Sequence, residues 1–175
     1  MKYFIVSDIH GSYKYAKILI DKYNELKCDK ILLLGDILYH GPRNDLPEEY
    51  NPKEVIKLLN QYQDKIIAIK GNCDAEVDEM VLSFKINNSY DDIINGIKTH
   101  LEHGHHLDTY NGDAKIILYG HTHIPTLENK NNQTFINPGS ISIPKANSSY
   151  SYAIWDNNEI IGYDIFNNIN FKFKY

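Results

Sequence analysis

The sequence is short of several residue types, and each shortage argues against a class of protein. Two cysteines, Cys28 and Cys73, among 175 residues are too few for a disulfide framework and favour a reducing compartment such as the cytoplasm. The 18 basic residues are outnumbered by 23 acidic ones, and a net charge of −5 argues against binding duplex nucleic acid. No apolar run has membrane-spanning length, and the apolar start is too short and wrongly flanked for a signal peptide. We therefore expect a cytoplasmic protein whose partners include neither a membrane nor duplex nucleic acid.

The sequence also lacks a linker rich in proline, glycine or serine, a low-complexity block and a charged tail. A chain of 175 residues with 42% hydrophobic side chains can bury one ordinary core. We therefore expect residues 1–175 to form a single domain.

Short aliphatic runs that stop at a polar residue dominate the first two thirds of the chain. They cover residues 3–8, 30–36, 65–72 and 115–121, and their β-branched content is typical of strands buried on both faces. Between them, the sequence predicts helices after Ser12, from the capping-box pattern Asn51-Pro52-Lys53-Glu54, and over residues 75–82, with a turn or two of helix over 90–95. Further strands are predicted at residues 97–102, 135–136, 151–155, 159–163 and 170–174. This order favours a mixed two-sheet sandwich with helices outside.

Most of these runs deliver side chains that can bind a metal ion at their carboxyl ends, where α/β sheets form ligand sites. The first run ends with Asp8 and His10, the second with Asp36, the third with Asn72, and the fourth with His121 and His123; the strand over residues 97–102 is followed by His103 and His105. Residues at positions i and i+2 of an extended backbone point to the same side. Carboxylate, imidazole and amide ligands suit divalent first-row metals, whereas structural zinc usually brings thiolates.

A single ion cannot use so many ligands, but two ions that share a carboxylate can. Two ions about 4 Å apart are the arrangement that promotes in-line displacement at phosphorus, and they lower the pKa of bound water toward about 7. Two divalent ions with Asp8 and Asp36 leave a net charge of +2, which matches a phosphodiester anion plus a hydroxide.

Five motifs in this order resemble the signature of the calcineurin-like metallophosphoesterases: Asp8-Ile-His10, Gly35-Asp36, Gly71-Asn72, His103-Gly-His105 and Gly120-His-Thr-His123. His40-Gly-Pro-Arg43, Gly71-Asn-Cys-Asp74 and Asn137-Pro-Gly-Ser140 resemble most the small bacterial phosphodiesterases of the YfcE type. The resemblance implies a four-layer αββα sandwich with a dinuclear metal site at one edge. It assigns one ion to Asp8, His10, Asp36 and His123, and the other to Asp36, Asn72, His103 and His121, with Asp36 bridging. His105 is a further candidate ligand.

The sequence departs from many members of the superfamily at Cys73. Those members carry histidine there, whose imidazole can contact the phosphoryl group or protonate the leaving oxygen. A thiol is a weak hydrogen-bond donor and a poor general acid for an alkoxide. The YfcE-type proteins resemble this chain in having cysteine at this position, so the departure bears on the choice between diesters and monoesters.

Three other residues complete the candidate site. His40 either faces the substrate as an acid or phosphate donor, or makes a structural hydrogen bond. Arg43, the only arginine, either binds phosphate oxygens with its planar guanidinium or forms an ordinary surface ion pair. Asp74 completes the Gly-Asn-Cys-Asp motif beside the Asn72 ligand. The loop over residues 38–49 and the stretch over 84–96 are where we expect substrate selectivity.

The predicted function is that of a dinuclear metal-dependent phosphodiesterase, in which a hydroxide held between the ions attacks phosphorus. The expected cofactors are two Mn²⁺ ions, with Zn²⁺, Fe²⁺, Co²⁺ or Ni²⁺ as alternatives. The expected partner is a small phosphate ester, and a homo-oligomer through exposed tyrosines and the strand carrying Phe171 and Phe173 is an alternative to a monomer. The rival functions are a phosphomonoesterase on the same site, and a catalytically silent scaffold of the same fold, like the retromer subunit that shares it.

Overall fold

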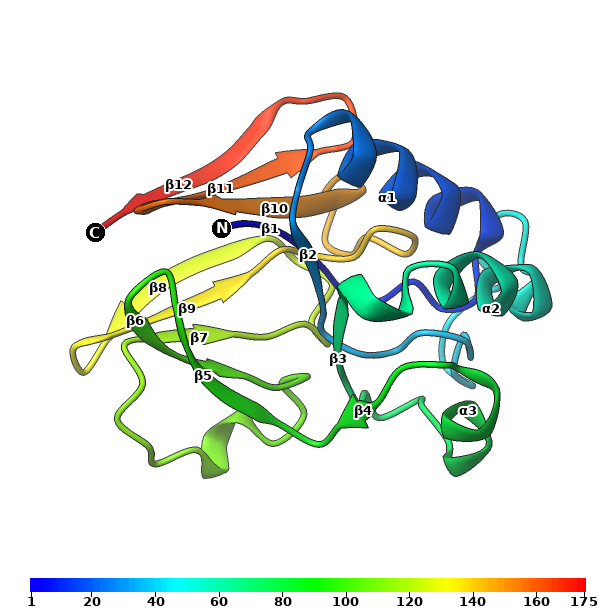
Figure 1. The fold of residues 1–175 in the computed structure, drawn as a ribbon, viewed down its shortest axis with the longest axis horizontal. Coiled ribbons are helices and arrows are strands. Elements are labelled where there is room, and N and C mark those ends of the chain that lie inside the picture. The colour runs from blue at the N-terminus through cyan, green and yellow to red at the C-terminus, as the bar shows by residue number, and fades with distance from the viewer.

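The computed structural model describes all residues 1–175, which form two mixed β-sheets with α-helices concentrated beside one of them (Figure 1). The seven-stranded sheet has the order β12-β11-β10-β1-β2-β3-β4, with strands Lys2–Val6 (β1), Lys30–Leu33 (β2), Ile66–Ile69 (β3), Ile86–Asn87 (β4), Ser151–Asp156 (β10), Glu159–Asp164 (β11) and Ile169–Lys174 (β12). The five-stranded sheet has the order β5-β6-β7-β9-β8, with strands Tyr90–Ile94 (β5), Ile97–Leu101 (β6), Ile116–Leu118 (β7), Thr126–Lys130 (β8) and Gln133–Asn137 (β9).

The helical elements are Tyr13–Glu25 (α1), Pro52–Asn60 (α2), Glu76–Val81 (α3) and the 3₁₀ turns Gln63–Lys65 (η1) and Leu107–Thr109 (η2). Strands β1, β2 and β3 pair in parallel, because the helical crossovers return the chain to the same end of the sheet. The predicted class of two mixed sheets flanked by helices is confirmed. No helix of the structure combines the length and the apolarity needed to cross a membrane.

Alternate residues of the central strands face two separate cores. In β1, Phe4 and Val6 face a 23-residue cluster shared with α1 and α2, whereas Ile5 faces a 13-residue cluster shared with the five-stranded sheet. Phe171 and Phe173 of β12 pack against this second cluster, so the strand suggested as an oligomer face already contributes to the core. The period-two burial of β1 thus holds the helices and the second sheet on opposite faces of one sheet.

The outer face of the five-stranded sheet is covered mainly by a loop rather than by α-helices. Tyr110, directly after η2, stacks on His100 of β6 with ring centroids 4.0 Å apart. The helical part of this outer layer of the sandwich is therefore the short η2 turn.

The predicted helix starts are confirmed. The Ser12 side chain accepts a hydrogen bond from the Tyr15 N–H, and that of Asn51 accepts one from the Glu54 N–H. The capping box at Asn51 is only half formed, because the Glu54 carboxylate binds Lys57 at 2.6 Å instead of turning back to the cap. An acid at position 54 therefore serves an i,i+3 ion pair on the helix surface.

The helical turns expected over residues 90–95 are wrong. Tyr90–Ile94 is strand β5, which pairs antiparallel with β6 through a tight turn at Asn95 and Gly96. Both turn residues have positive φ, 47° and 86°, as a type I′ hairpin requires. The Asn-Gly dipeptide was the signal for this hairpin.

Candidate metal centre

The proposed metal ligands lie in loops that leave the carboxyl ends of β1, β2, β3, β6 and β7. Five of them have left-handed backbone: Asp8 (φ 58°), His10 (48°), Asp36 (53°), His121 (66°) and His123 (62°). Such φ values cost non-glycine residues on the order of 1 kcal/mol or more each and persist where surrounding structure imposes them, often at functional sites. The chain turns sharply at each strand end, which aims these side chains inward rather than along the strands.

One group of donors consists of Asp8, His10 and His123, all buried. The Asp8 Oδ1 atom lies 3.6 Å from His10 Nε2 and 3.3 Å from His123 Nε2. The two imidazole nitrogens are themselves 3.3 Å apart. Three donor atoms from β1 and from the loop after β7 thus converge on one point.

The second group joins the first through Asp8 and Asp36. The Asp36 Oδ2 atom lies 3.4 Å from His103 Nε2 and 3.6 Å from His10 Nε2, so it stands between the two groups. The side-chain oxygen of Asn72 lies 3.1 Å from His103 Nε2. Asp8, Asp36 and His103 form a further group in which the donor atoms all approach one another, as do His10, Asp36 and Cys73.

Hydrogen bonds at the far side of each ring fix the orientation of three imidazoles. The Nδ1 atom of His10 lies 2.8 Å from the Tyr39 carbonyl, that of His103 2.7 Å from the Leu34 carbonyl, and that of His123 2.6 Å from the Ile143 carbonyl. A carbonyl only accepts, so Nδ1 carries the proton in each ring. In the neutral ring, Nε2 then presents a lone pair to the cluster, as metal-binding histidines do.

The residues present fit a pair of cations. With Nδ1 protonated in each neutral ring, the Nε2 atoms of His10 and His123 are two acceptors facing each other, and His103 Nε2 faces the acceptor oxygen of Asn72. The buried Asp8 Oδ1 has no hydrogen-bond partner. Facing acceptors and an orphaned carboxylate oxygen repel one another unless positive charge lies among them.

The charges of the cluster follow from these contacts. Burial alone would raise the pKa of Asp8, but the neighbouring imidazoles of His10, His123 and His103 hold that pKa far below its usual range. Burial would lower the pKa of His103, but Asp36 and Asp8 raise it to about 9, so without an ion a proton on Nε2 supplies the positive charge that an ion would bring. Against its burial, the pKa of Asp36 is lowered, chiefly by His103. Both carboxylates are therefore anionic at neutral pH, and the cluster attracts cations.

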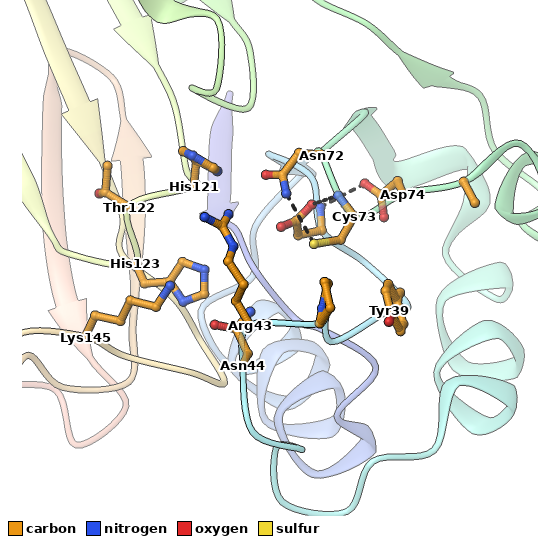
Figure 2. A pocket seen from close by; sticks show the side chains of 14 residues that line it. Tyr39, Arg43, Asn44, Asn72, Cys73, Asp74, His121, Thr122, His123 and Lys145 are labelled. Atoms are coloured by element: carbon orange, nitrogen blue, oxygen red, sulfur yellow. Dashed lines mark hydrogen bonds between the residues drawn. The ribbon is translucent and has the colours of Figure 1, made fainter.

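His121 and His105 lie further from the centre of the cluster. The His121 ring centroid is 5.2 Å from that of His103, and its backbone N–H donates to Asp8 Oδ2 at 3.1 Å. Its side chain lines the pocket next to Asn72 (Figure 2). His105 is exposed, with its ring 5.5 Å from that of His103. His121 thus stands at the border of the second group, and His105 outside it.

In the motif after β3, Cys73 and Asp74 have different roles. The Cys73 N–H donates to Asp36 Oδ1 at 2.8 Å, and its thiol lines the pocket. Burial first, and then Asp36, raise the pKa of the Cys73 thiol to about 12, so the thiol keeps its proton at neutral pH. The buried Asp74 carboxylate instead accepts from the backbone N–H groups of Asp36, Ile37 and Gly71 at 2.7–2.8 Å. Its contacts make it a positioning residue that joins the loops after β2 and β3.

Of the two remaining candidate residues, His40 and Arg43, only Arg43 lines the pocket. His40 is not among the residues that line the pocket, because its ring packs edge-on against Tyr39 and Tyr50 with centroids 4.8 and 5.2 Å away. Arg43 has no carboxylate within ion-pair distance and reaches into the pocket toward His121 and Asn72 (Figure 2).

Lys145, which carries no signal of function in the sequence, lines the same pocket beside His123 (Figure 2). No motif surrounds it, and its position depends on a long loop folding over the site. Two serines of the same loop also support the site: Ser140 and Ser142 both donate to the Asp8 carbonyl, at 2.9 and 2.8 Å. Asn137 supports the His121 loop by donating to the Gly120 carbonyl at 2.6 Å.

The chain has a two-sheet α/β fold, and its strand ends bring carboxylates, imidazoles and an amide together. This fold and this site are those of a metal-binding α/β protein. The model of the calcineurin-like phosphoesterase superfamily domain matches residues 1–159. The chain is 40% identical to phosphodiesterase YfcE of Escherichia coli K12 over 162 residues, 90% of this chain and 88% of that protein. The chain therefore belongs to the calcineurin-like phosphoesterase superfamily.

Solved structures agree with this family. The structure of YfcE, a phosphoesterase from E. coli, superimposes with a TM-score of 0.96 at 35% identity and covers 99% of both chains. Vacuolar protein sorting 29 from Cryptosporidium parvum shares the fold, with a TM-score of 0.66 at 17% identity over 99% of this chain and 98% of that one. The fold thus occurs in proteins of diverged sequence, and function must be argued from the site.

Proposed function

We propose that this chain is a dinuclear metal-dependent phosphodiesterase, a hydrolase of small phosphate esters that works in the cytoplasm as one domain. The observation that carries the proposal is the set of acceptor atoms that face one another around Asp8 and Asp36. The 40% identity to a protein named as a phosphodiesterase supports the same reaction class. The two free cysteines of this chain, Cys28 and Cys73, are consistent with a reducing compartment.

Two groups of residues would hold two divalent ions. Asp8, His10, Asp36 and His123 would hold the first, and Asp36, Asn72, His103 and His121 the second. The place of Asp36 Oδ2 between His10 and His103 supports its assignment as the bridge. Mixed oxygen and imidazole donors favour Mn²⁺, with Zn²⁺, Fe²⁺, Co²⁺ and Ni²⁺ as alternatives.

When bound, two such ions supply Lewis acidity and lower the pKa of coordinated water. The chain's own residues orient the reactants around them. Nδ1 hydrogen bonds hold His10, His103 and His123 in one tautomer, and Asp74 fixes the loops that carry Asp36 and Asn72. Such preorganised groups need little reorganisation during the reaction.

The residue beside Asn72 restricts the leaving group. The Cys73 thiol is protonated at neutral pH but is a weak hydrogen-bond donor and a poor acid for an alkoxide. The site therefore suits esters whose leaving oxygen departs without strong protonation. Cys73→His tests this assignment: faster hydrolysis of a monoester in the variant shows that the missing imidazole limits the substrate class.

One observation favours the phosphomonoesterase alternative. Arg43 and Lys145 both line the pocket, and additional cationic groups can neutralise the second charge of a monoester. The alternative of a silent scaffold predicts that ligand positions have been lost. All seven proposed positions carry a residue able to bind a metal, and six of them lie within hydrogen-bond or ion-pair distance of another.

The proposed function is tested by loading metal-free protein with Mn²⁺ and measuring hydrolysis of bis(p-nitrophenyl) phosphate and p-nitrophenyl phosphate. We expect metal-dependent hydrolysis of the diester, reduced more than about a hundredfold in Asp36→Ala and His121→Ala. Asp21→Ala, which removes an exposed carboxylate of α1, is the matched control. No turnover of either ester despite two bound ions per chain contradicts the enzyme, and full activity of Asp36→Ala contradicts the bridge.

A further inference from the structure

Two cationic side chains share the pocket with the proposed metal ligands. The pocket has a volume of about 840 Å³, and Arg43 and Lys145 are the only arginine and lysine that line it. Arg43 belongs to the loop between β2 and α2, and Lys145 to the loop between β9 and β10. Figure 2 shows Arg43 extending across the pocket toward His121, while Lys145 runs alongside His123. Separate loops thus bring two positive charges into the pocket that contains the metal centre.

Neither cation is neutralised by the protein. Six lysines elsewhere on the surface have a carboxylate within 4.0 Å, but Arg43 and Lys145 have none. The two carboxylates that line the pocket are already engaged, Asp36 with His103 and Asp74 with three backbone N–H groups. Both cations are therefore available to a ligand.

The backbone under Lys145 is tied to the metal centre. Its N–H donates to the His123 carbonyl at 3.4 Å, and Ser148 Oγ lies 2.7 Å from the Lys145 carbonyl and 3.3 Å from the His123 carbonyl. The backbone beside Arg43 is held by Asn44, whose side chain donates to the His40 carbonyl at 2.7 Å. These contacts hold the backbone at Arg43 and Lys145 in place. Less conformational entropy is therefore lost when both side chains bind one ligand.

The charge of the pocket exceeds that of a simple diester. With two divalent ions, Asp8 and Asp36 leave a net charge of +2; Arg43 and Lys145 add two positive charges and the Asp74 carboxylate one negative charge, which gives +3. A diester anion and a hydroxide together carry two negative charges. A pocket of about 840 Å³ also has room for more than the reacting phosphate, since pockets of about 300–1,000 Å³ hold whole small molecules.

We propose that Arg43 and Lys145 form an anion subsite that binds a second phosphate group, carried on the alcohol part of the substrate. This inference rests on the proposed function, and it narrows the substrate class to phosphodiesters with an additional phosphate near the scissile bond. Arg43 provides a planar fork that pairs with two phosphate oxygens, and Lys145 adds a point charge beside it.

The test uses two chromogenic diesters that differ only in the second phosphate: thymidine 5′-(p-nitrophenyl phosphate) and the same compound with a 3′-phosphate. For the Mn²⁺-loaded wild type, we expect kcat/KM to be about tenfold or more higher for the 3′-phosphorylated diester, mainly through a lower KM, which is the scale of hydrogen bonds to a charged group. Arg43→Gln and Lys145→Gln should each remove most of this preference. The preference is a ratio within each variant, so a general fall in turnover cancels.

Lys130→Gln is the matched control, because Lys130 is exposed on β8 and does not line the pocket. It should keep the wild-type preference. Raising the salt concentration should reduce the preference in the wild type, since exposed charges are screened. Calorimetry supplies a readout without turnover: thymidine 3′,5′-bisphosphate should bind the loaded wild type more tightly than thymidine 5′-monophosphate, and the difference should shrink in both pocket variants.

The outcomes separate the inference from the proposed function. Equal kcat/KM for the two diesters, with Mn²⁺-dependent turnover of both, overturns the subsite and leaves the phosphodiesterase in place. Preferential hydrolysis of p-nitrophenyl phosphate, lost in Arg43→Gln and Lys145→Gln, overturns the subsite in favour of the monoesterase. If no ester is hydrolysed, the proposed function fails, and equal affinities for the bisphosphate and monophosphate overturn the subsite as well.

Discussion

Asp74 shows how one side chain can organise a site without being a ligand. Its carboxylate accepts hydrogen bonds from the backbone of Asp36, Ile37 and Gly71, and so joins two loops that leave neighbouring strands. The nearby Asp78 is equally buried, but its carboxylate accepts only the Ala75 N–H, at 2.9 Å. Two buried acids of one segment thus differ in how many backbone groups depend on them.

We expect Asp74→Asn to lower the free energy of unfolding of the metal-free protein by about 2–3 kcal/mol, because the new amide group points N–H donors at backbone N–H donors. Asp78→Asn, the matched control, should cost less. Urea denaturation measures both values. Equal costs for the two variants would contradict the role assigned to Asp74.

His100 is a buried histidine outside the metal centre. Its Nδ1 lies 2.9 Å from Asp91 Oδ1 and its Nε2 3.4 Å from Glu102 Oε2. Burial alone would lower the pKa of His100, but Glu102 and Asp91 outweigh it and raise the pKa above 6.5. Folding therefore favours the protonated ring.

A raised pKa fixes the sign of the pH dependence. The stabilisation by His100 is fully present below the unfolded pKa of about 6.5 and is lost as the pH rises through the higher folded value. We expect His100→Gln to cost more at about pH 6 than at about pH 8, measured as the difference in unfolding free energy from the wild type. A cost of His100→Gln that grows with pH would contradict the assignment.

Among the secondary-structure elements, glycine is required for one reason in the turn between β5 and β6 and for another at the end of β7. A Cβ on Gly96, between β5 and β6, meets no atom within 4 Å, so only its φ of 86° demands glycine. A Cβ on Gly120, after β7, would collide with the Ser7 side chain and lie 2.9 Å from Asp8 Oδ2. Close approach of the Ser7 and Asp8 side chains, rather than φ, demands glycine at position 120.

We expect Gly96→Ala to lower the unfolding free energy by about 1 kcal/mol and to leave Mn²⁺ affinity unchanged. Gly120→Ala should cost more and weaken Mn²⁺ binding at least about tenfold, because the first ligand loop must shift. Calorimetric titration with Mn²⁺ separates the two variants. Unchanged affinity in Gly120→Ala would show that the loops tolerate the shift.

For the molecule as a whole, the metal centre joins the two sheets. Asp8 and Asp36 follow strands of the seven-stranded sheet, whereas His103 and His123 follow strands of the other. Ions bound between them would connect the carboxyl ends of both sheets, and any ligand that binds only the folded state stabilises it.

We expect Mn²⁺ at about a hundred times its dissociation constant to raise the free energy of unfolding by about 2.7 kcal/mol. Thermal unfolding followed with and without Mn²⁺ measures the shift, and a chelator should reverse it. His103→Ala should reduce the gain strongly, and His106→Ala should not. A wild-type unfolding midpoint that does not respond to Mn²⁺ would contradict a metal centre between the sheets.

Local sequence patterns predict the two mixed sheets and the candidate ligands, because strand ends and the polar residues that follow them are short-range features. Aliphatic runs that end in glycine and a polar residue mark the strand ends, and parallel strands place those ends at one edge. Ser12 and Asn51 marked the helix starts for the same local reason. The β5–β6 hairpin at Asn95 and Gly96 was also readable, but the Asn-Gly turn signal was passed over.

The folded structure, in contrast, was needed to find which other side chains reach the site. It placed Lys145 beside His123, held the His40 ring between two tyrosines, and turned Asp74 toward three backbone groups. None of these positions has a periodic or spacing signal, because each depends on how a loop packs against segments distant in sequence. Strand ends follow from local geometry, whereas the lining of the pocket depends on the packing of the whole chain.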